Sequence, residues 1–178
     1  MTSSVSTHIE LREARPSDLD ILIFWDKQEH NIFADPNDDW DWESELAKNP
    51  EWRTQLMAEL NGRPIGFVQI IDPALEESDY WGEVEKNLRA IDIWIGEAKD
   101  IGKGYGTIMM DQAIDFCFSS GNVEGILIDP LTINVKAIRF YERLGFEFVE
   151  FRLFGEDDCS VYQLTRKKWM ENKTISTK

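Results

Sequence analysis

The sequence has little cysteine and little histidine, with two residues of each in 178. Cys117 and Cys159 lie far apart, and neither has an evident partner in His8 or His30. Zinc sites need cysteine or histidine at short spacings, which this sequence lacks. A cysteine nucleophile, a metal hydrolase and a disulfide framework are therefore disfavoured. No metal is expected, and a reducing compartment is predicted.

Long apolar runs and excess positive charge are also missing. No run approaches the length of a membrane span, and residues 1–8 lack the basic and apolar parts of a leader peptide, so we expect a cytoplasmic protein. The 34 acidic residues outnumber 19 basic ones, for a net charge of −15. Such a surface repels nucleic acid and anionic membranes and attracts polycations, although solubility alone also explains scattered acids.

The most informative segment is 101–107, in which Gly102, Gly104 and Gly106 occupy every second position. Glycines allow tight turns and leave consecutive N–H groups free for an anion, and the helix-periodic run that follows would point its positive end at them. A dinucleotide fingerprint would need glycine at Thr107, and a P-loop would need Gly-Lys-Ser/Thr. The segment predicts a phosphate-binding loop, with a ligand-free turn as the alternative.

The remaining patterns predict one α+β domain over residues 1–178, because this length supports a single sizeable core. Asn61-Gly62 between two β-rich runs is a strong hairpin signal. We expect strands over residues 8–15, 52–60, 64–72, 87–95, 123–128, 146–154 and 160–165. We expect helices over residues 19–27, 43–48, 107–118 and 133–144. The turn 155–158 would close the last hairpin, and residues 166–178 are expected to form a frayed polar tail.

Two segments mix aromatic with acidic residues. The stretch 29–42 contains Trp40 and Trp42, and a long loop over 73–86 contains Trp81. Exposing aromatics in a loop is costly, so we expect the first stretch to form a wall of an acceptor site. The alternative is that its two tryptophans simply cover the core.

A second motif spans residues 134–146, where Asn134 would open a helix and Tyr141 precedes Gly145-Phe146 by about one turn. With Gly104 and Gly106, it resembles the two signatures of the GCN5-related N-acetyltransferase (GNAT) superfamily, in the family's order. The resemblance covers nearly the whole chain and is closest to the aminoglycoside 6′-N-acetyltransferases. Ile101 departs from the pattern, since the family usually has Arg or Gln there.

This resemblance implies a fold and a cosubstrate. The GNAT fold has a mixed, mostly antiparallel sheet of six or seven strands, flanked here by about four helices. The cosubstrate would be acetyl-CoA, with its pyrophosphate on the glycine loop and its pantetheine along the strand 87–95. The implied cofactor-binding residues are Ile93, Trp94, Ile95, Ile101, Gly102, Lys103, Gly104, Tyr105, Gly106, Thr107, Asn134 and Ala137.

The resemblance also assigns chemical roles. Asp92 lies within the strand 87–95, where a carboxylate must reach the sheet edge or be paired, and it would be the general base. Tyr141 would be the general acid, whereas its helical spacing alone favours a core tyrosine. The implied acceptor-binding residues are Trp40, Trp81, Asp129 and Asp157. The assignment of Asp157 depends on a hairpin alignment that can slip by one residue.

The acceptor itself has several candidates. The branch resemblance favours direct acetyl transfer to a primary amine of a cationic small molecule, an aminoglycoside 6′-amine. Polyamines, peptide or protein N-termini and siderophore hydroxylamines are alternatives, and a CoA-binding module without turnover is another. Nucleic acid and membranes are not expected as partners, and the protein is expected to be a monomer or a homodimer.

Overall fold

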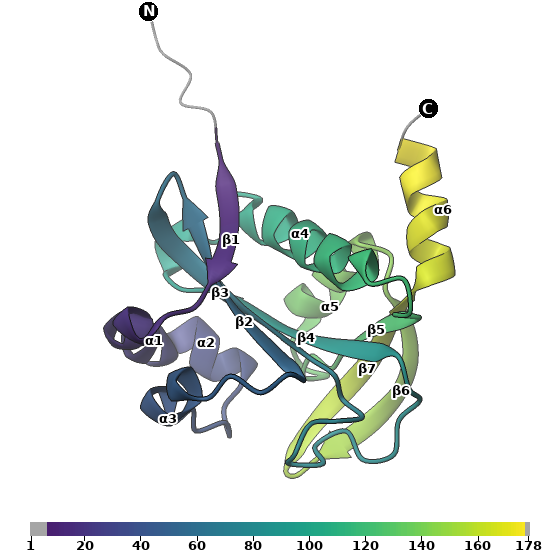
Figure 1. Cartoon of the computed structure of the whole chain (residues 1–178), viewed down its shortest axis with the longest axis horizontal. Helices are drawn as coiled ribbons and strands as arrows, with labels where there is room; N and C mark the ends of the chain where they lie inside the picture. The colour runs from purple at the N-terminus through teal and green to yellow at the C-terminus, as the bar shows by residue number, and fades with distance from the viewer. Residues whose placement is uncertain (1–6, 177–178) are drawn as a thin grey trace, which may run out of the picture.

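The structure is a computed structural model that describes residues 7–176. Seven strands form one sheet in the order β1-β2-β3-β4-β5-β7-β6 (Figure 1). The strands are β1 (Ile9–Glu13), β2 (Arg53–Leu60), β3 (Arg63–Ile71), β4 (Leu88–Ile95), β5 (Gly125–Ile128), β6 (Glu147–Phe154) and β7 (Asp157–Thr165). All neighbouring strands are antiparallel except β4 and β5, so the predicted mixed, mostly antiparallel sheet is confirmed.

The described residues contain six α-helices, two more than the sequence predicts. They are α1 (Leu19–Asp26), α2 (Glu29–Ala34), α3 (Trp42–Ala47), α4 (Tyr105–Ser119), α5 (Val135–Arg143) and α6 (Arg166–Ser176). The additional helices are α2, at the start of the stretch taken for a loop, and α6, where the frayed tail is expected. Both expectations are wrong over these residues.

The helix α6 forms because the rest of the fold holds it. The Arg166 guanidinium donates hydrogen bonds to the carbonyls of Phe118, Ser120 and Val123, at the end of α4 and just beyond it. The Trp169 ring stacks on Phe118 with centroids 4.8 Å apart. These contacts are distant in sequence, so the polar composition of the segment alone does not reveal them.

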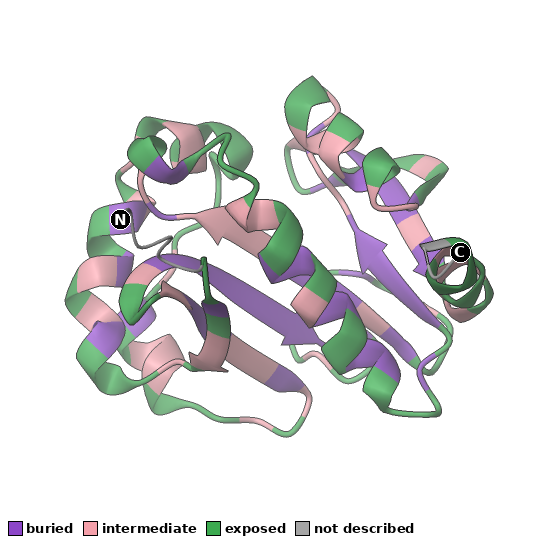
Figure 2. Ribbon diagram, turned by 90° about the horizontal axis from the view of Figure 1, so that it is seen from above, coloured by how far each residue is buried: buried purple, intermediate pink, exposed green. Residues whose placement is uncertain are grey.

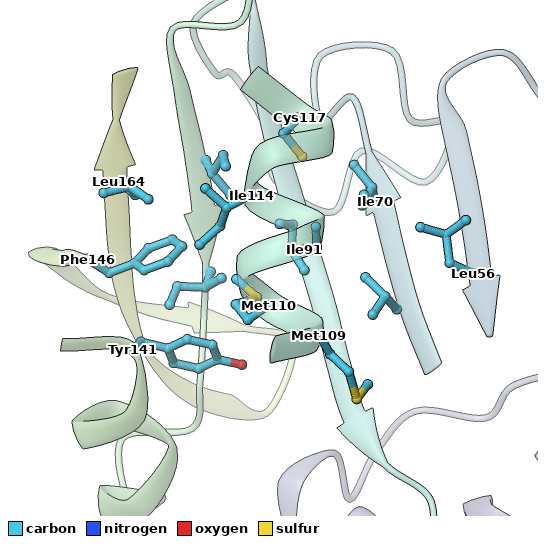
Figure 3. Packing of buried hydrophobic residues seen from close by; sticks show 14 of the residues in the cluster. Leu56, Ile70, Ile91, Met109, Met110, Ile114, Cys117, Tyr141, Phe146 and Leu164 are labelled. Atoms are coloured by element: carbon cyan, nitrogen blue, oxygen red, sulfur yellow. The ribbon is translucent and has the colours of Figure 1, made fainter. Parts of the chain in front are cut away.

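Two layers of helices cover the sheet. The buried face of α4, with Met110, Ile114 and Cys117, packs on one side together with Tyr141 of α5 (Figure 3). The other side is covered by α1 and α3, where Trp25 and Trp42 pack on Phe67. Buried residues accordingly concentrate on the strands and on the inner faces of the helices (Figure 2). No helix within residues 7–176 is long and apolar enough to cross a membrane.

Both predicted hairpins form, but the turn of the last one is shorter than predicted. Asn61 and Gly62 have φ values of 50° and 84°, as the tight turn between β2 and β3 requires, so that hairpin is confirmed. In the last hairpin Phe154 pairs with Asp157, so its turn is shorter than the predicted 155–158. Asp157 is therefore the first residue of β7 and not part of the turn.

The sheet splits at its only parallel pair among the described strands. β4 and β5 are in register from Leu88–Gly125 to Ala90–Leu127 and no further. β4 continues to Ile95, whereas β5 ends at Ile128. The β5-facing edge of β4 from residue 91 onward is thus left without a strand partner, at the centre of the sheet.

Candidate active site

A cleft of about 1540 Å³ opens at this split. Its size exceeds the roughly 300–1,000 Å³ of an ordinary small-molecule pocket, so it has room for two substrates. Most of the residues singled out from the sequence line it: Trp40, Trp81, Asp92, Ile93, Trp94, Ile95, Ile101, Gly102, Gly104, Gly106, Thr107, Asp129, Asn134, Ala137, Tyr141 and Asp157. Lys103 and Tyr105 do not contribute to the lining.

The glycine loop presents a row of free amides to the cleft. Gly102 and Gly104 adopt φ values of +75° and +81°, and an added Cβ at either would meet no atom within 4 Å. Within residues 7–176, the backbone N–H groups from Gly102 to Thr107 have no hydrogen-bond acceptor. Since α4 begins at Tyr105, its positive end adds to this potential. The loop therefore fits the pyrophosphate of a nucleotide cosubstrate.

An ion pair between the buried Asp100 and the exposed Arg63 supports this loop. Asp100, only 2% exposed, accepts two hydrogen bonds of 2.8 and 2.9 Å from the Arg63 guanidinium. Lys103 lies 3.8 Å from the same carboxylate. Asp100 directly precedes the cleft-lining loop, so this pair connects the loop to the start of β3. Sequence reasoning missed it, because the partners are 37 residues apart.

We expect Arg63→Met to lower the free energy of unfolding by about 1–3 kcal/mol, because it leaves the Asp100 carboxylate buried without its main partner. The Arg63 guanidinium holds the pKa of Asp100 below its usual value, so the stabilisation is present above about pH 4 and is lost on acidification. Urea unfolding at pH 7 and pH 3 measures both effects. Lys99→Met, which removes an exposed pair with Glu97, is the control and should change stability by less than about 0.5 kcal/mol. An equal change in both variants would contradict the prediction.

Asp92 projects from the face of β4 opposite α4, beside the split. Gln69 Nε2 donates to its Oδ2 at 3.3 Å, and Gln55 Nε2 in turn donates to Gln69 Oε1 at 3.0 Å. Burial and the nearby Asp129 raise the pKa of Asp92 to about 7. Sequence reasoning missed Gln69, although a polar residue at a buried position of β3 was a usable signal.

Tyr141 approaches the cleft from α5, on the other face of the sheet (Figure 3). Its pKa is raised by burial and by the charges of Asp92 and Asp129, so it keeps its phenolic proton at neutral pH. Asp92 and Tyr141 come from opposite faces, and the gap between β4 and β5 lets one cleft include both. A carboxyl group with a pKa near 7 thus shares a cleft with a protonated phenol.

Asp129 follows β5 directly and lies deep in the same cleft. Burial raises its pKa to about 6, while a 2.6 Å hydrogen bond from the Tyr80 hydroxyl opposes that rise. Asp157, at the start of β7, accepts a hydrogen bond from the Asn37 side-chain amide, which reaches it from the segment between α2 and α3. The cleft therefore carries several carboxylates.

The two tryptophans of the stretch 29–42 differ in their surroundings. Trp42 is buried and donates from its ring nitrogen to Asp26, so the core alternative holds for this residue. Trp40 is half-buried, stacks on Trp42 at 4.8 Å and 10°, and lines the cleft. Trp81 is 4% exposed and packs against Phe154, so only a small part of its ring faces the cleft.

Within residues 7–176, no cluster of His, Cys, Asp and Glu has an arrangement that could hold a metal ion.

A mixed sheet split at its parallel pair, beside a loop of free amides, defines the class of acetyltransferases that take acetyl groups from a CoA thioester. Residues 15–153 match the family described as Acetyltransferase (GNAT) domain, and the chain belongs to this family.

Two curated relatives carry the same name. The chain is 34% identical over 126 residues to the aminoglycoside N(6′)-acetyltransferase type 1 of Klebsiella pneumoniae, covering 69% of this chain and 62% of the relative. It is 40% identical over 96 residues to the enzyme of that name from Serratia marcescens, covering 53% of this chain and 47% of the relative. The match thus spans about half to three fifths of these relatives' own length.

The fold agrees with solved structures over a larger share. A crystal structure of the aminoglycoside acetyltransferase AAC(6′)-Ib with coenzyme A and kanamycin has a TM-score of 0.83 at 28% identity. The alignment covers 93% of this chain and 99% of that one. The predicted GNAT fold is confirmed.

Proposed function

We propose that this protein is an acetyl-CoA-dependent N-acetyltransferase that transfers acetyl directly to a primary amine of a cationic small molecule, with an aminoglycoside 6′-amine as the preferred acceptor. The observation that carries the proposal is the position of Asp92. Its carboxyl group has a pKa raised to about 7 and lies at the split of the sheet, in one cleft with Tyr141 and the amide loop.

The residues fit the tasks of this reaction. Acetyl-CoA would supply the acetyl group as an activated thioester, held by the amides of residues 102–107 and by the unpaired edge of β4. Asp92 accepts the proton of the attacking amine, and its pKa near the working pH suits a general base. Tyr141 retains a proton that it can donate to the leaving group. No covalent enzyme intermediate is needed.

The charge of the cleft favours a cationic acceptor. Asp129 and Asp157 line it together with Asp92, and Asp35 and Asp38 line it from the segment that follows α2. Burial, added to repulsion by Asp38 and Asp92, raises the pKa of Asp35. Ammonium groups would relieve this repulsion, so a molecule with several amines gains more than a monoamine. Trp40 and Trp81 provide apolar surface for its carbon skeleton.

The relatives favour an aminoglycoside among cationic acceptors. The names of the relatives from Klebsiella pneumoniae and Serratia marcescens specify 6′-acetylation, and kanamycin is bound in a structural neighbour.

We further propose that the protein works in the cytoplasm, since Cys117 and Cys159 are both free and buried, as in a reducing compartment.

A thiol-reactive dye that reports CoA release tests the proposal. With acetyl-CoA fixed, we expect release with kanamycin and tobramycin and little with spermidine or a peptide amine. Release with spermidine or the peptide alone would support N-acetyl transfer but contradict an aminoglycoside as the acceptor. Tight CoA binding without release on any amine would contradict the enzymatic proposal and indicate a binding module.

A further inference from the structure

Tyr80 makes a contact that the proposed proton transfers do not require. It belongs to the loop between β3 and β4, yet its hydroxyl donates a hydrogen bond of 2.6 Å to Oδ2 of Asp129, 49 residues away. We propose that Tyr80 is a positioning residue for the acceptor, one that keeps Asp129 anionic and oriented so that Oδ1 can receive one ammonium group of the substrate. This inference rests on the proposed function.

The Tyr80 ring is held in place by two aromatic contacts. It stacks on Phe154 with centroids 4.5 Å apart and planes 6° apart, and it meets the edge of Trp81 at 5.8 Å and 78°. Arg152 stabilises this arrangement of the three rings. Its guanidinium donates a hydrogen bond to the Trp81 carbonyl at 3.0 Å and lies 5.5 Å from the centre of the Phe154 ring. The hydroxyl is therefore aimed at Asp129 by packing, so little side-chain entropy is lost when the hydrogen bond forms.

The surroundings of Asp129 show why such a donor is useful. The titratable groups that face it are Tyr80, Asp92, Tyr141, Arg152, Asp157 and Cys159. Burial favours the neutral carboxyl group and raises its pKa to about 6, and repulsion from Asp157 acts in the same direction. The hydrogen bond from Tyr80 favours the anion, because a donor stabilises the charged form. Without it, more of Asp129 would be neutral near pH 7 and would bind an ammonium group weakly.

The hydrogen bond also divides the two oxygens of Asp129 between different partners. Tyr80 occupies Oδ2, which leaves Oδ1 for the acceptor. The pKa of Tyr80 is itself raised by burial and by Asp129, so the phenol remains protonated and cannot become a competing anion. Tyr80 is 48% exposed, and its ring offers an apolar surface next to the charge. This combination suits an ammonium group carried on a sugar or aliphatic ring.

The variant that tests the proposal is Tyr80→Phe, which removes the hydroxyl and keeps the ring. We expect KM for the aminoglycoside to rise about tenfold, the effect of losing a hydrogen bond to a charged group, with kcat changed less than about twofold. Tyr162→Phe is the matched control, since Tyr162 also donates to a carboxylate, Glu142 at 3.0 Å, outside the cleft. It should leave both constants unchanged.

A double-mutant cycle separates positioning from general structure. In an Asp129→Asn background, Tyr80→Phe should have almost no further effect on KM, because the hydrogen bond serves the carboxylate. Equal effects of Tyr80→Phe in both backgrounds, or a fall in kcat without a change in KM, would overturn the proposal.

A measurement without turnover keeps this inference separate from the proposed function. The pKa of Asp129 can be followed by carboxyl ¹³C chemical shifts, assigned with Asp129→Asn, and should be higher in Tyr80→Phe than in the unmodified protein. An unchanged pKa overturns the role of Tyr80 even if the protein acetylates amines. A raised pKa in a protein that acetylates no amine supports the role of the hydrogen bond and contradicts the proposed function instead.

Discussion

Replacing Asp92 with Asn is expected to lower kcat by about 10²- to 10⁴-fold, the usual contribution of a general base. In the unmodified protein, kcat/KM should rise with pH through an inflection near 7, because Asp92 must lose its proton before it can accept one from the amine. The variant should lack this inflection. Steady-state kinetics between pH 5.5 and 8.5, with acetyl-CoA saturating, measure both effects.

The stability of the same variant distinguishes loss of the base from misfolding. Burial raises the pKa of folded Asp92 well above its usual 3.8, so the folded state retains a proton that the unfolded chain has lost. Stability therefore falls as the pH rises from about 4 to 7, and Asp92→Asn should be at least as stable as the unmodified protein at pH 8. Asp111→Asn, on the exposed part of α4, is the control and should keep full activity. A kcat loss of less than tenfold would contradict the role of Asp92 as base.

Replacing Gly96 with Ala should destabilise the fold strongly. Gly96 follows β4 directly, and an added Cβ would overlap the ring of Trp25 from α1. Trp25 is completely buried and packs within the cluster of Leu22, Trp42 and Phe67, so it cannot move aside. Overpacking of this kind typically costs about 1–3 kcal/mol or more.

Thermal or urea unfolding measures this effect against a matched glycine. At Gly121 an added Cβ would meet no atom within 4 Å, and the backbone there needs no left-handed conformation. Gly121→Ala should therefore leave stability unchanged or slightly raised. If both variants unfold at the same denaturant concentration, the close packing of Trp25 on Gly96 is not a constraint on this fold.

Several parts of the fold could be predicted because they depend on residues close in sequence. The helix over 107–118 follows from apolar residues three and four positions apart, and α4 buries that same face. Asn61-Gly62 specifies its own turn, since both residues tolerate positive φ. The alternating glycines of 102–106 likewise follow from the local sequence, since Gly102 and Gly104 adopt the positive φ values that glycine tolerates.

Where the prediction failed, distant residues decide the structure. The helix α6 depends on Phe118 and on carbonyls near the end of α4, more than forty positions earlier. Asp157 is a strand residue because Phe154 pairs with it, which turn composition did not reveal. Local patterns carry no information about such partners.

The candidate site also combines features set by nearby residues with features set by distant ones. By itself the sequence determined the family, and it predicted the glycine loop and the residue types proposed as base and acid, because these lie in short motifs whose chemistry is local. Only the tertiary structure decided that Asp92 and Tyr141 line one cleft from opposite faces of the sheet, which requires β4 and β5 to separate after Ala90. The tertiary structure alone shows that Gln69 donates a hydrogen bond to Asp92 and that Tyr80 donates one to Asp129. The pKa of a carboxyl group depends on burial and on charges brought close by folding, so those partners, and not the motif, set how the site titrates.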